Sequence, residues 1–469
     1  MTDTLAVRRP VAVPELPPVF RFGVATASYQ IEGAVTADGR GPSIWDTYSH
    51  TPGATLGGDT GDVACDHYHR YAEDVALMAD LGVDAYRFSI AWPRVQPTGS
   101  GAVNPAGLAF YDRLVDALLA TGIEPVPTLY HWDLPQPLED AGGWPERDTA
   151  ARFADYAEIV HAALGDRVTK WITLNEPFCS SILGYAVGRH APGRHEGRTA
   201  LAAAHHLLLG HGLAVQRMRA TRPEQEYGIT LNLVPVAPAG DAPSDVAAAA
   251  RSHLLHNTLF TDPVLAGRYP ADAAEVWDAY GDLDFVRPGD LEVTSTPVDF
   301  LGVNYYFPMT IAAAPHDVAD PAARTASDLG TTTVVNPGAE TTTMGWPVEA
   351  AGLDRLLRWI TATYGDAVPA VEITENGRAC ADVVVDGAVD DPERIDYLAN
   401  HLAATASAVD AGVPVRAYYC WSLLDNFEWA EGYSQRFGLV HTDYATQERT
   451  PKASARWYAD LVRAHRARR

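Results

Sequence analysis

Cysteine is scarce in this sequence, which has four in 469 residues. Cys65, Cys179, Cys380 and Cys420 are widely separated, so they match neither the CxxC pairs of zinc sites nor the density of disulfide-stabilised domains. Reduced thiols of this kind are typical of a cytoplasmic protein. Cys179 lies three residues after Glu176, and we expect it to pack in the core rather than to act as a nucleophile.

Long apolar segments are also missing. Nowhere do about eighteen apolar residues follow one another, as a membrane-spanning helix requires. Residues 1–20 contain Arg8 and Arg9 but no apolar stretch of the kind found in secretory signals. We therefore expect a soluble, cytoplasmic protein without a membrane partner, and residues 1–18 are expected to form an extended tail.

Positive charge is the third deficit. Lys and Arg number 35 against 60 Asp and Glu, and the formal net charge is −25. Nucleic acids and anionic membranes bind clustered Lys and Arg, so the balance argues against such partners and favours a neutral small molecule. Hydrophobic residues make up 47% of the chain, which is enough for a large core.

Short segments rich in β-branched and aromatic residues alternate with longer amphipathic segments along the chain. This alternation is typical of βα units around a parallel sheet. The pattern predicts eight strands, at residues 22–26, 85–89, 124–130, 170–175, 228–232, 300–305, 371–374 and 415–421. A helix is expected after each strand, near residues 69–81, 107–121, 148–164, 198–219, 245–260, 351–364, 391–411 and 452–466.

Eight βα units can close into a barrel or form an open, doubly wound sheet. The first predicted strand is not followed by the Gly-rich turn of dinucleotide-binding sheets, and eight strands are the number that closes a barrel. There is no internal repeat and no Pro/Gly-rich linker. The sequence therefore predicts an α/β fold with a single (β/α)8 TIM barrel over residues 1–469, and a domain boundary near Asp241 is the alternative.

Residues 311–343 do not follow the alternation of strand-like and helix-like segments. They are rich in Ala, Thr, Pro and Asp and have little helical or strand periodicity, so they are predicted to form a long surface loop. The loop follows the sixth strand, on the barrel face where active sites are built. It either controls access of a substrate or is a simple excursion of the chain.

Two glutamates follow predicted strands at positions suited to catalysis. Glu176 ends the fourth strand in the segment LNEP, and Glu375 ends the seventh in the segment TENG. These strands lie on roughly opposite sides of an eight-stranded barrel, so both carboxylates are expected to face its opening. Glycoside hydrolysis requires such a pair. The distance between the two carboxyl groups separates retaining from inverting enzymes, and the residues alone leave both open.

The other strand ends are rich in aromatic, amide and imidazole groups. Sugars are recognised by such groups, because their C–H faces stack on rings and their hydroxyls take paired hydrogen bonds. Phosphate-binding sites would be more basic. The candidates are Gln30, Arg87, His131, Trp132, Asn304, Tyr306, Trp421 and Trp429.

Distinctive motifs occur in order along the whole chain. They are FRFGVATASYQIEGA at 20–34, DHYHRYAEDVALM at 66–78, YRFSIAWPR at 86–94, TLYHWDLPQPLEDAGGW at 128–144, WITLNEPF at 171–178, LGVNYYFP at 301–308, VEITENG at 371–377 and WSLLDNFEWAEGYSQRFGLVHTDY at 421–444. Together they resemble the motifs of family-one glycoside hydrolases, the retaining barrels that include bacterial β-glucosidases and β-galactosidases. The resemblance implies a β-glucosidase that removes terminal, non-reducing β-D-glucosyl residues from small β-glucosides and oligosaccharides such as cellobiose, through a covalent glycosyl-enzyme intermediate. It also implies β-galactosidase or β-fucosidase side activity, with no cofactor and no metal.

By this resemblance Glu375 is the nucleophile and Glu176 is the acid/base, which implies retention. Arg87 and Tyr306 are expected to support the negative charge of Glu375, and that charge should raise the pKa of Glu176. Asn175 is expected to bind the sugar 2-hydroxyl. The implied substrate-binding residues are Gln30, His131, Trp132, Asn175, Asn304, Tyr306, Trp421, Glu428, Trp429 and Phe437.

Some residues limit the range of possible substrates, whereas others give no information about the aglycone. Glu428 would repel a phosphate on the sugar, and an intact Glu176 argues against a thioglucosidase. Phe178 stands where the resembling family commonly has Trp, and Phe307 stands where Thr is usual. The aglycone, the balance among glucosidase, galactosidase and fucosidase activity, glucose tolerance, and hydrolysis against transfer are therefore left open. A homo-oligomer is compatible with the sequence.

Two other classes remain as alternatives. A catalytically inactive sugar-binding barrel would have lost one carboxylate, and both are present. A metal hydrolase would have to use His205, His206 and His211, whose spacing lacks a ligand motif, so we expect core or helix-surface histidines. The segment GGDTGD at 57–62 is expected to be a turn rather than a phosphate loop, because no strand precedes it and no Lys follows.

Overall fold

The structure is a computed structural model, and it describes residues 16–277, 283–320 and 324–468. Of the predicted tail, residues 1–15 lie outside the described residues, whereas Leu16 is buried in the hydrophobic core. Within the described ranges no helix is both long and apolar enough to cross a membrane.

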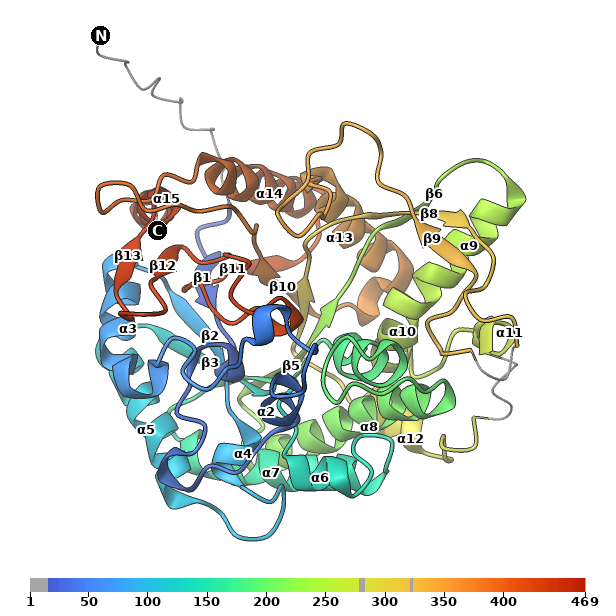
Figure 1. The fold of residues 1–469 in the computed structure, drawn as a ribbon, viewed down its shortest axis with the longest axis horizontal. Helices are drawn as coiled ribbons and strands as arrows, with labels where there is room; N and C mark the ends of the chain where they lie inside the picture. The colour runs from blue at the N-terminus through green and yellow to red at the C-terminus, as the bar shows by residue number, and fades with distance from the viewer. Residues whose placement is uncertain (1–15, 278–282, 321–323, 469) are drawn as a thin grey trace.

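Parallel strands close into a barrel, seen end-on near the middle of Figure 1. The predicted (β/α)8 barrel is therefore confirmed, and no predicted strand end is displaced by more than two residues. Each strand pairs with its neighbours, and the last pairs with the first. In order around the barrel the strands are β1 (Arg21–Ala25), β2 (Ala85–Ser89), β3 (Glu124–Tyr130), β4 (Lys170–Asn175), β5 (Glu226–Asn232), β7 (Phe300–Asn304), β10 (Ala370–Asn376) and β11 (Val415–Trp421).

Helices form a ring around the barrel (Figure 1). Proline stands in the first turn of three of them, α5, α9 and α14, where its missing N–H costs no helical hydrogen bond. The predicted helix near residues 245–260 is instead divided into three parts, α9, the π-helical turn η4 and α10. The long helices are α3 (His67–Leu81), α5 (Pro105–Ala120), α7 (Asp148–Leu164), α8 (Arg198–Thr221), α9 (Pro243–His253), η4 (Leu254–Thr258), α10 (Leu259–Ala266), α13 (Ala350–Tyr364), α14 (Pro392–Asp410) and α15 (Ala453–Arg466).

Short elements that the sequence did not predict occupy the connections. Most of them follow the carboxyl ends of barrel strands, where they form the walls above the barrel. They include α1 (Ser28–Ile31), α2 (Ile44–Ser49), α4 (Trp92–Val95), α6 (Gln136–Asp140), a π-helix η3 (Cys179–Val187), α11 (Ala273–Trp277), α12 (Asp290–Thr294), and the paired strands β12 (Val440–Thr442) and β13 (Arg449–Pro451).

The prediction that residues 311–343 form a surface loop is wrong in part, because two short strands lie within or overlap this range. Three strands form a separate sheet, β6 (Val236–Pro238), β8 (Met309–Ala313) and β9 (Thr331–Thr333), which lies beside α9 in Figure 1. Ile311 is buried with Ala248 and Ala249 of α9 in a small apolar cluster. The strands pair across long sequence separations, so no local period marks them.

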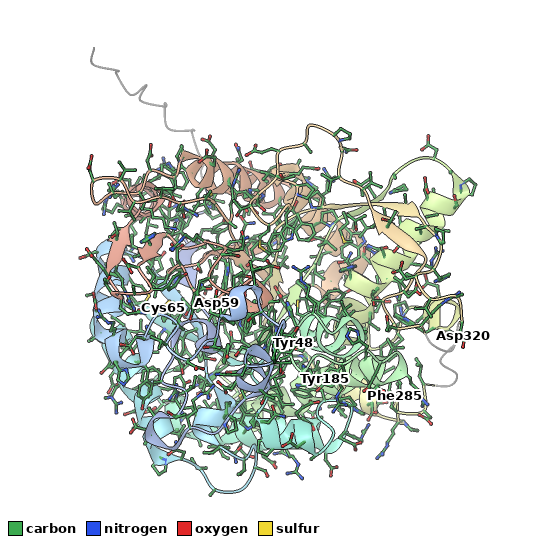
Figure 2. All side chains as sticks on the ribbon, in the orientation of Figure 1. Tyr48, Asp59, Cys65, Tyr185, Phe285 and Asp320 are labelled. Carbon is green, nitrogen blue, oxygen red and sulfur yellow. The ribbon has the colours of Figure 1, made fainter. Side chains whose placement is uncertain are left out.

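Side chains fill the space between the strands and the helices (Figure 2). At the amino-terminal end of the barrel, a charge network closes the interior. Lys170 Nζ on β4 donates to Glu372 Oε1 on β10 at 2.6 Å, and Arg416 Nε on β11 donates to the same oxygen at 2.8 Å. This network therefore plugs the amino-terminal end of the barrel.

Candidate active site

A cavity of about 300 Å³ lies at the carboxyl ends of the barrel strands. Glu176 and Glu375 both line it, from β4 and β10 respectively. Gln30 and Asn175, which were predicted to bind the substrate, are not among the lining residues, but they hydrogen-bond the lining residues Glu428 and His131 respectively. The other predicted substrate-binding residues line it directly: His131, Trp132, Asn304, Tyr306, Trp421, Glu428, Trp429 and Phe437.

Glu375 is held by two donors, one on each carboxylate oxygen. Arg87 Nη1, from β2, donates to Oε1 at 2.5 Å, and the Tyr306 hydroxyl donates to Oε2 at 2.7 Å. Burial and the charge of Glu375 raise the pKa of Tyr306 well above its ordinary value, so this hydroxyl keeps its proton. One cation and one neutral donor thus compensate an ionised Glu375 and fix its orientation.

Glu176 has a different environment. Asn304 Nδ2 donates to Oε1 at 2.6 Å and the Cys179 thiol donates to Oε2 at 3.2 Å. Both of these donors are neutral groups, in contrast to the Arg87 cation on Glu375. Burial, followed by the negative charge of Glu375, raises the pKa of Glu176 to about 8. Near neutral pH the Glu176 carboxyl therefore carries a proton that it can donate.

The pH dependence of Glu176 provides a test of this arrangement. In the unaltered protein we expect kcat/KM to fall as pH rises through about 8, where Glu176 loses its proton. In Glu375→Gln the neighbouring negative charge is gone, so the pKa of Glu176 should fall toward that of an ordinary carboxyl. Difference infrared titration of the Glu176 carboxyl would measure both values. An unchanged pKa in Glu375→Gln would contradict the electrostatic coupling.

A chain of hydrogen bonds joins the two glutamates. Arg87 Nη2 donates to Asn175 Oδ1 at 2.5 Å, and Asn304 Nδ2 donates to the same oxygen at 3.0 Å. Asn175 Nδ2 then donates to His131 Nε2 at 3.0 Å. Since Asn304 also contacts Glu176, and Arg87 also contacts Glu375, the two carboxylates share one rigid frame.

Two buried polar atoms in the described part of the chain are left without a partner near this frame. His131 accepts at Nε2, so its proton lies on Nδ1, and Nδ1 has no partner. Burial and the nearby Arg87 lower the pKa of His131 well below its usual value, so the ring is neutral. Gln30 Oε1 is likewise unpaired, whereas its Nε2 donates to Asn426, Phe427 and Glu428. One donor and one acceptor are therefore available to a ligand's hydroxyl groups.

Glu428 is the third carboxyl group at the cavity. Burial, followed by the charges of Glu375 and Glu176, raises its pKa to about 8. The carboxyl therefore offers a donor as well as an acceptor near neutral pH, which suits a neutral hydroxyl.

Aromatic rings form the remaining walls. His131 stacks on Trp421 and on Trp429, with ring centroids 6.0 and 5.9 Å apart.

Trp132, Glu176 and Trp429 all have a positive φ, at 78°, 46° and 52°. Such backbone costs roughly 1–3 kcal/mol per residue and is concentrated at functional sites. The rest of the barrel therefore holds these three side chains in place against local strain.

The outer part of the cavity contains residues that the sequence interpretation did not single out. Two residues noted only as departures, Phe178 and Phe307, stack on His256 and Trp346 with centroids 4.4 and 4.9 Å apart. Because these partners belong to distant connections, no local motif could have marked them. The missed lining residues include Leu183, Arg189, His190, Asn232, Leu233, Val234, His256, Met344, Trp346 and Glu431.

Cys179 was predicted to be a packing residue, and the structure adds a contact with Glu176. The thiol is buried, and burial together with the charge of Glu176 raises its pKa well above the usual range. A thiol of this kind is a poor nucleophile at neutral pH. Cys179 therefore acts on Glu176 as a hydrogen-bond donor.

The three histidines of α8 are core residues rather than surface ones. His205 contacts Tyr269 and Asp290, and His211 contacts Thr173. In the described ranges no group of three or more His, Cys, Asp or Glu side chains is arranged to hold a metal. The segment 57–62 is a turn region, and Asp59 accepts a hydrogen bond from the Tyr433 backbone N–H.

Comparison with known proteins places these features in a family context. The sequence model described as Glycosyl hydrolase family 1 matches residues 13–467. Thermostable β-glucosidase B of Thermobispora bispora is 51% identical over 449 residues, covering 95% of this chain and 90% of that protein. The bifunctional β-D-glucosidase/β-D-fucosidase of Bifidobacterium breve is 48% identical, covering 96% and 99%. The crystal structure of the AHE enzyme from Alicyclobacillus herbarius has a TM-score of 0.92 and 51% identity, covering 97% and 98%.

Proposed function

Because the chain belongs to glycosyl hydrolase family 1, whose members are retaining glycosidases, we propose that Glu375 is its nucleophile and Glu176 its acid/base. The protein is a β-glucosidase that cleaves terminal β-D-glucosyl residues. One observation carries the assignment of roles. Two buried carboxyl groups at one cavity have opposite environments, since Glu375 is paired with the Arg87 cation whereas Glu176 accepts from the neutral groups of Asn304 and Cys179.

In the first step Glu375 attacks the anomeric carbon while Glu176 gives its proton to the departing oxygen. Arg87 and Tyr306 keep Glu375 oriented for attack. The C–O bond to the aglycone breaks, and a covalent ester forms between Glu375 and the sugar. In this proposal Asn175 binds the 2-hydroxyl, a contact that strengthens as positive charge develops on the ring.

In the second step the same groups reverse their roles. Glu375 is neutral as an ester, so the charge that raised the pKa of Glu176 is gone. Glu176 then takes a proton from an incoming water as the water attacks the anomeric carbon, and the ester bond breaks to release Glu375 as a carboxylate. Two inversions return the sugar to its original β configuration.

The proposed substrates are small, unphosphorylated β-glucosides, including cellobiose. The unpaired Gln30 Oε1 and His131 Nδ1 support a ligand rich in hydroxyl groups. A phosphorylated sugar is disfavoured, because Arg87 is already engaged by Glu375 and Arg189 on the cavity wall by Glu431, so neither cation is available to a phosphate. The bifunctional relative supports β-fucosidase side activity as well.

A panel of p-nitrophenyl glycosides tests the proposed substrate. We expect the β-glucoside to be turned over, the β-fucoside and β-galactoside to follow, and the 6-phospho-β-glucoside to react at least about 100-fold more slowly. Rates of p-nitrophenol release with the purified protein provide the measurement. A folded protein that releases no p-nitrophenol from any glycoside would contradict the proposed activity, and preference for the phosphorylated sugar would contradict the proposed role of Glu428.

We propose in addition that residues 1–469 act as one catalytic domain in the cytoplasm. A single large hydrophobic cluster includes residues from Leu16 to Val462, which supports one domain. All four cysteines are free thiols, which is typical of a reducing compartment.

A further inference from the structure

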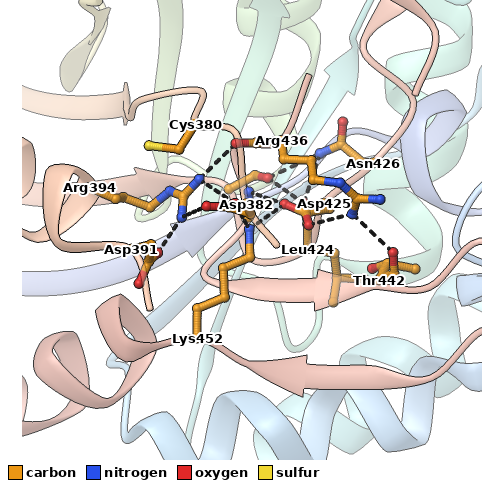
Figure 3. Close-up of polar contacts among 12 residues, drawn as sticks. Cys380, Asp382, Asp391, Arg394, Leu424, Asp425, Asn426, Arg436, Thr442 and Lys452 are labelled. Carbon is orange, nitrogen blue, oxygen red and sulfur yellow. Dashed lines mark hydrogen bonds and ion pairs between the residues drawn. The ribbon is translucent and has the colours of Figure 1, made fainter. Parts of the chain in front are cut away.

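A buried cluster of charged residues from segments far apart in the sequence is joined by polar contacts (Figure 3). None of its members lines the cavity. The side chains of Asp391, Arg394, Asp425 and Lys452 have no exposed surface. Desolvating so many charges is costly, so stability alone does not account for them. The buried charge cluster consists of the carboxylates Asp382, Asp391 and Asp425 and the cations Arg394, Arg436 and Lys452.

The cluster joins the two ends of segment 425–438, which follows β11. Asp425 begins the segment, and its carboxylate accepts from Arg436 Nη1 at 2.8 Å and from the Gly438 backbone N–H at 2.9 Å. Lys452, which precedes α15, donates to Asp425 Oδ1 at 2.6 Å. One carboxylate therefore closes the base of the segment.

The same cluster fastens the segment to neighbouring parts of the barrel. Arg394 of α14 donates to the Arg436 carbonyl at 2.8 Å and to Asp382 Oδ2 at 2.7 Å. Lys452 bridges Asp382 to Asp425. Since Asp382 lies in the connection after β10, the ends of segment 425–438 are tied to two adjacent βα units.

Segment 425–438 carries five residues that line the cavity, Glu428, Trp429, Ala430, Glu431 and Phe437. Glu428 contacts Gln30 at 3.4 Å, a long hydrogen bond that constrains the carboxyl only weakly. The Glu428 backbone N–H donates to Gly432 O at 2.7 Å, a contact internal to the segment. The backbone of the preceding residue, Phe427, exchanges two hydrogen bonds with Gln30, which fixes one point of the segment. The direction of the Glu428 side chain therefore depends on this contact and on how the ends of the segment are anchored.

We infer that the buried charge cluster is a positioning device, which fixes the ends of segment 425–438 and thereby aims Glu428 at the outer hydroxyls of the sugar. The charges of its three carboxylates and three cations balance, so removing any one leaves an unpaired buried charge. Apolar packing would fill the same space without fixing the direction of each contact. The inference rests on the proposed glycosidase activity.

The test compares two substrates that differ only at the outer part of the sugar. β-Xylosides lack the hydroxymethyl group of β-glucosides, so a displaced Glu428 affects them less. In Arg436→Met and in Asp425→Asn we expect the ratio of kcat/KM for p-nitrophenyl β-glucoside to that for the β-xyloside to fall about tenfold. A smaller folded fraction would lower both values equally and cancel in the ratio.

Two further variants complete the experiment. Arg436→Lys keeps the positive charge at a partly exposed site and should recover part of the ratio. Lys170→Met removes a buried cation at the plugged end of the barrel and should leave the ratio unchanged. A ratio within about twofold of the unaltered protein in both Arg436→Met and Asp425→Asn would overturn the inference. An unaltered protein that cleaves neither glycoside would instead contradict the proposed function.

Discussion

Replacing Glu375 with glycine is expected to lower kcat by roughly five to six orders of magnitude, because no other group on the described cavity wall is placed to form the covalent intermediate. Azide or formate should restore part of the activity by occupying the space of the lost carboxylate. Since azide then attacks the sugar directly, with a single inversion, the product should be the α-glucosyl azide. Rates with and without azide, and NMR of the product, measure both effects.

The matched control is Glu158→Gly, which removes an exposed carboxylate on α7. It should retain nearly the full rate and gain nothing from azide. A Glu375→Gly protein that is folded, inactive and insensitive to azide and formate would count against the nucleophile assignment. A β-configured azide product would place the lost residue in the second step instead.

Replacing Glu176 with alanine should have an effect that depends on the leaving group. Poor leaving groups, such as the second glucose of cellobiose, need a proton, so kcat/KM should fall by about 10³–10⁴-fold. A 2,4-dinitrophenolate leaves without help, so kcat/KM for that glucoside should fall by no more than about tenfold. An equal fall of kcat/KM for both substrates would contradict the assignment of Glu176 as the acid/base.

Azide distinguishes the two glutamates further. In Glu176→Ala the covalent intermediate still forms on Glu375, and its hydrolysis is slow because no base activates water. Azide needs no such base, so it should speed turnover and give the β-glucosyl azide after two inversions. The opposite anomers from the two variants thus separate nucleophile from acid/base in one assay.

The sequence was sufficient for the barrel and for the inner part of the site. Strand segments such as 170–175 and 415–421 carry a local signal, because buried parallel strands are short, apolar and β-branched. Glu176 and Glu375 could be placed at one face because all parallel strands of a barrel end at the same side. The aromatic and amide groups that follow these strands obey the same rule.

The outer part of the site and the small separate sheet could not be predicted, because they depend on contacts between distant segments of the chain. Trp346 and His256 reach the cavity from long connections, and the sheet of β6, β8 and β9 pairs residues far apart in the chain. The link between Asp425 and Lys452 could not be predicted either, because the two residues are 27 positions apart and no local pattern pairs them. The pKa of Glu176 depends on burial and on the distance to Glu375, which only the folded structure supplies.

The most direct test of the central claim is to trap the intermediate in the unaltered protein. A 2-deoxy-2-fluoro-β-glucoside with a good leaving group should inactivate the protein. The fluorine slows both steps, but the good leaving group compensates for this in the first step, so the covalent intermediate accumulates. Peptide mass spectrometry should then find one fluoroglucosyl group, on Glu375. Labelling of another residue, or turnover of the reagent without any labelled protein, would contradict a covalent mechanism through Glu375.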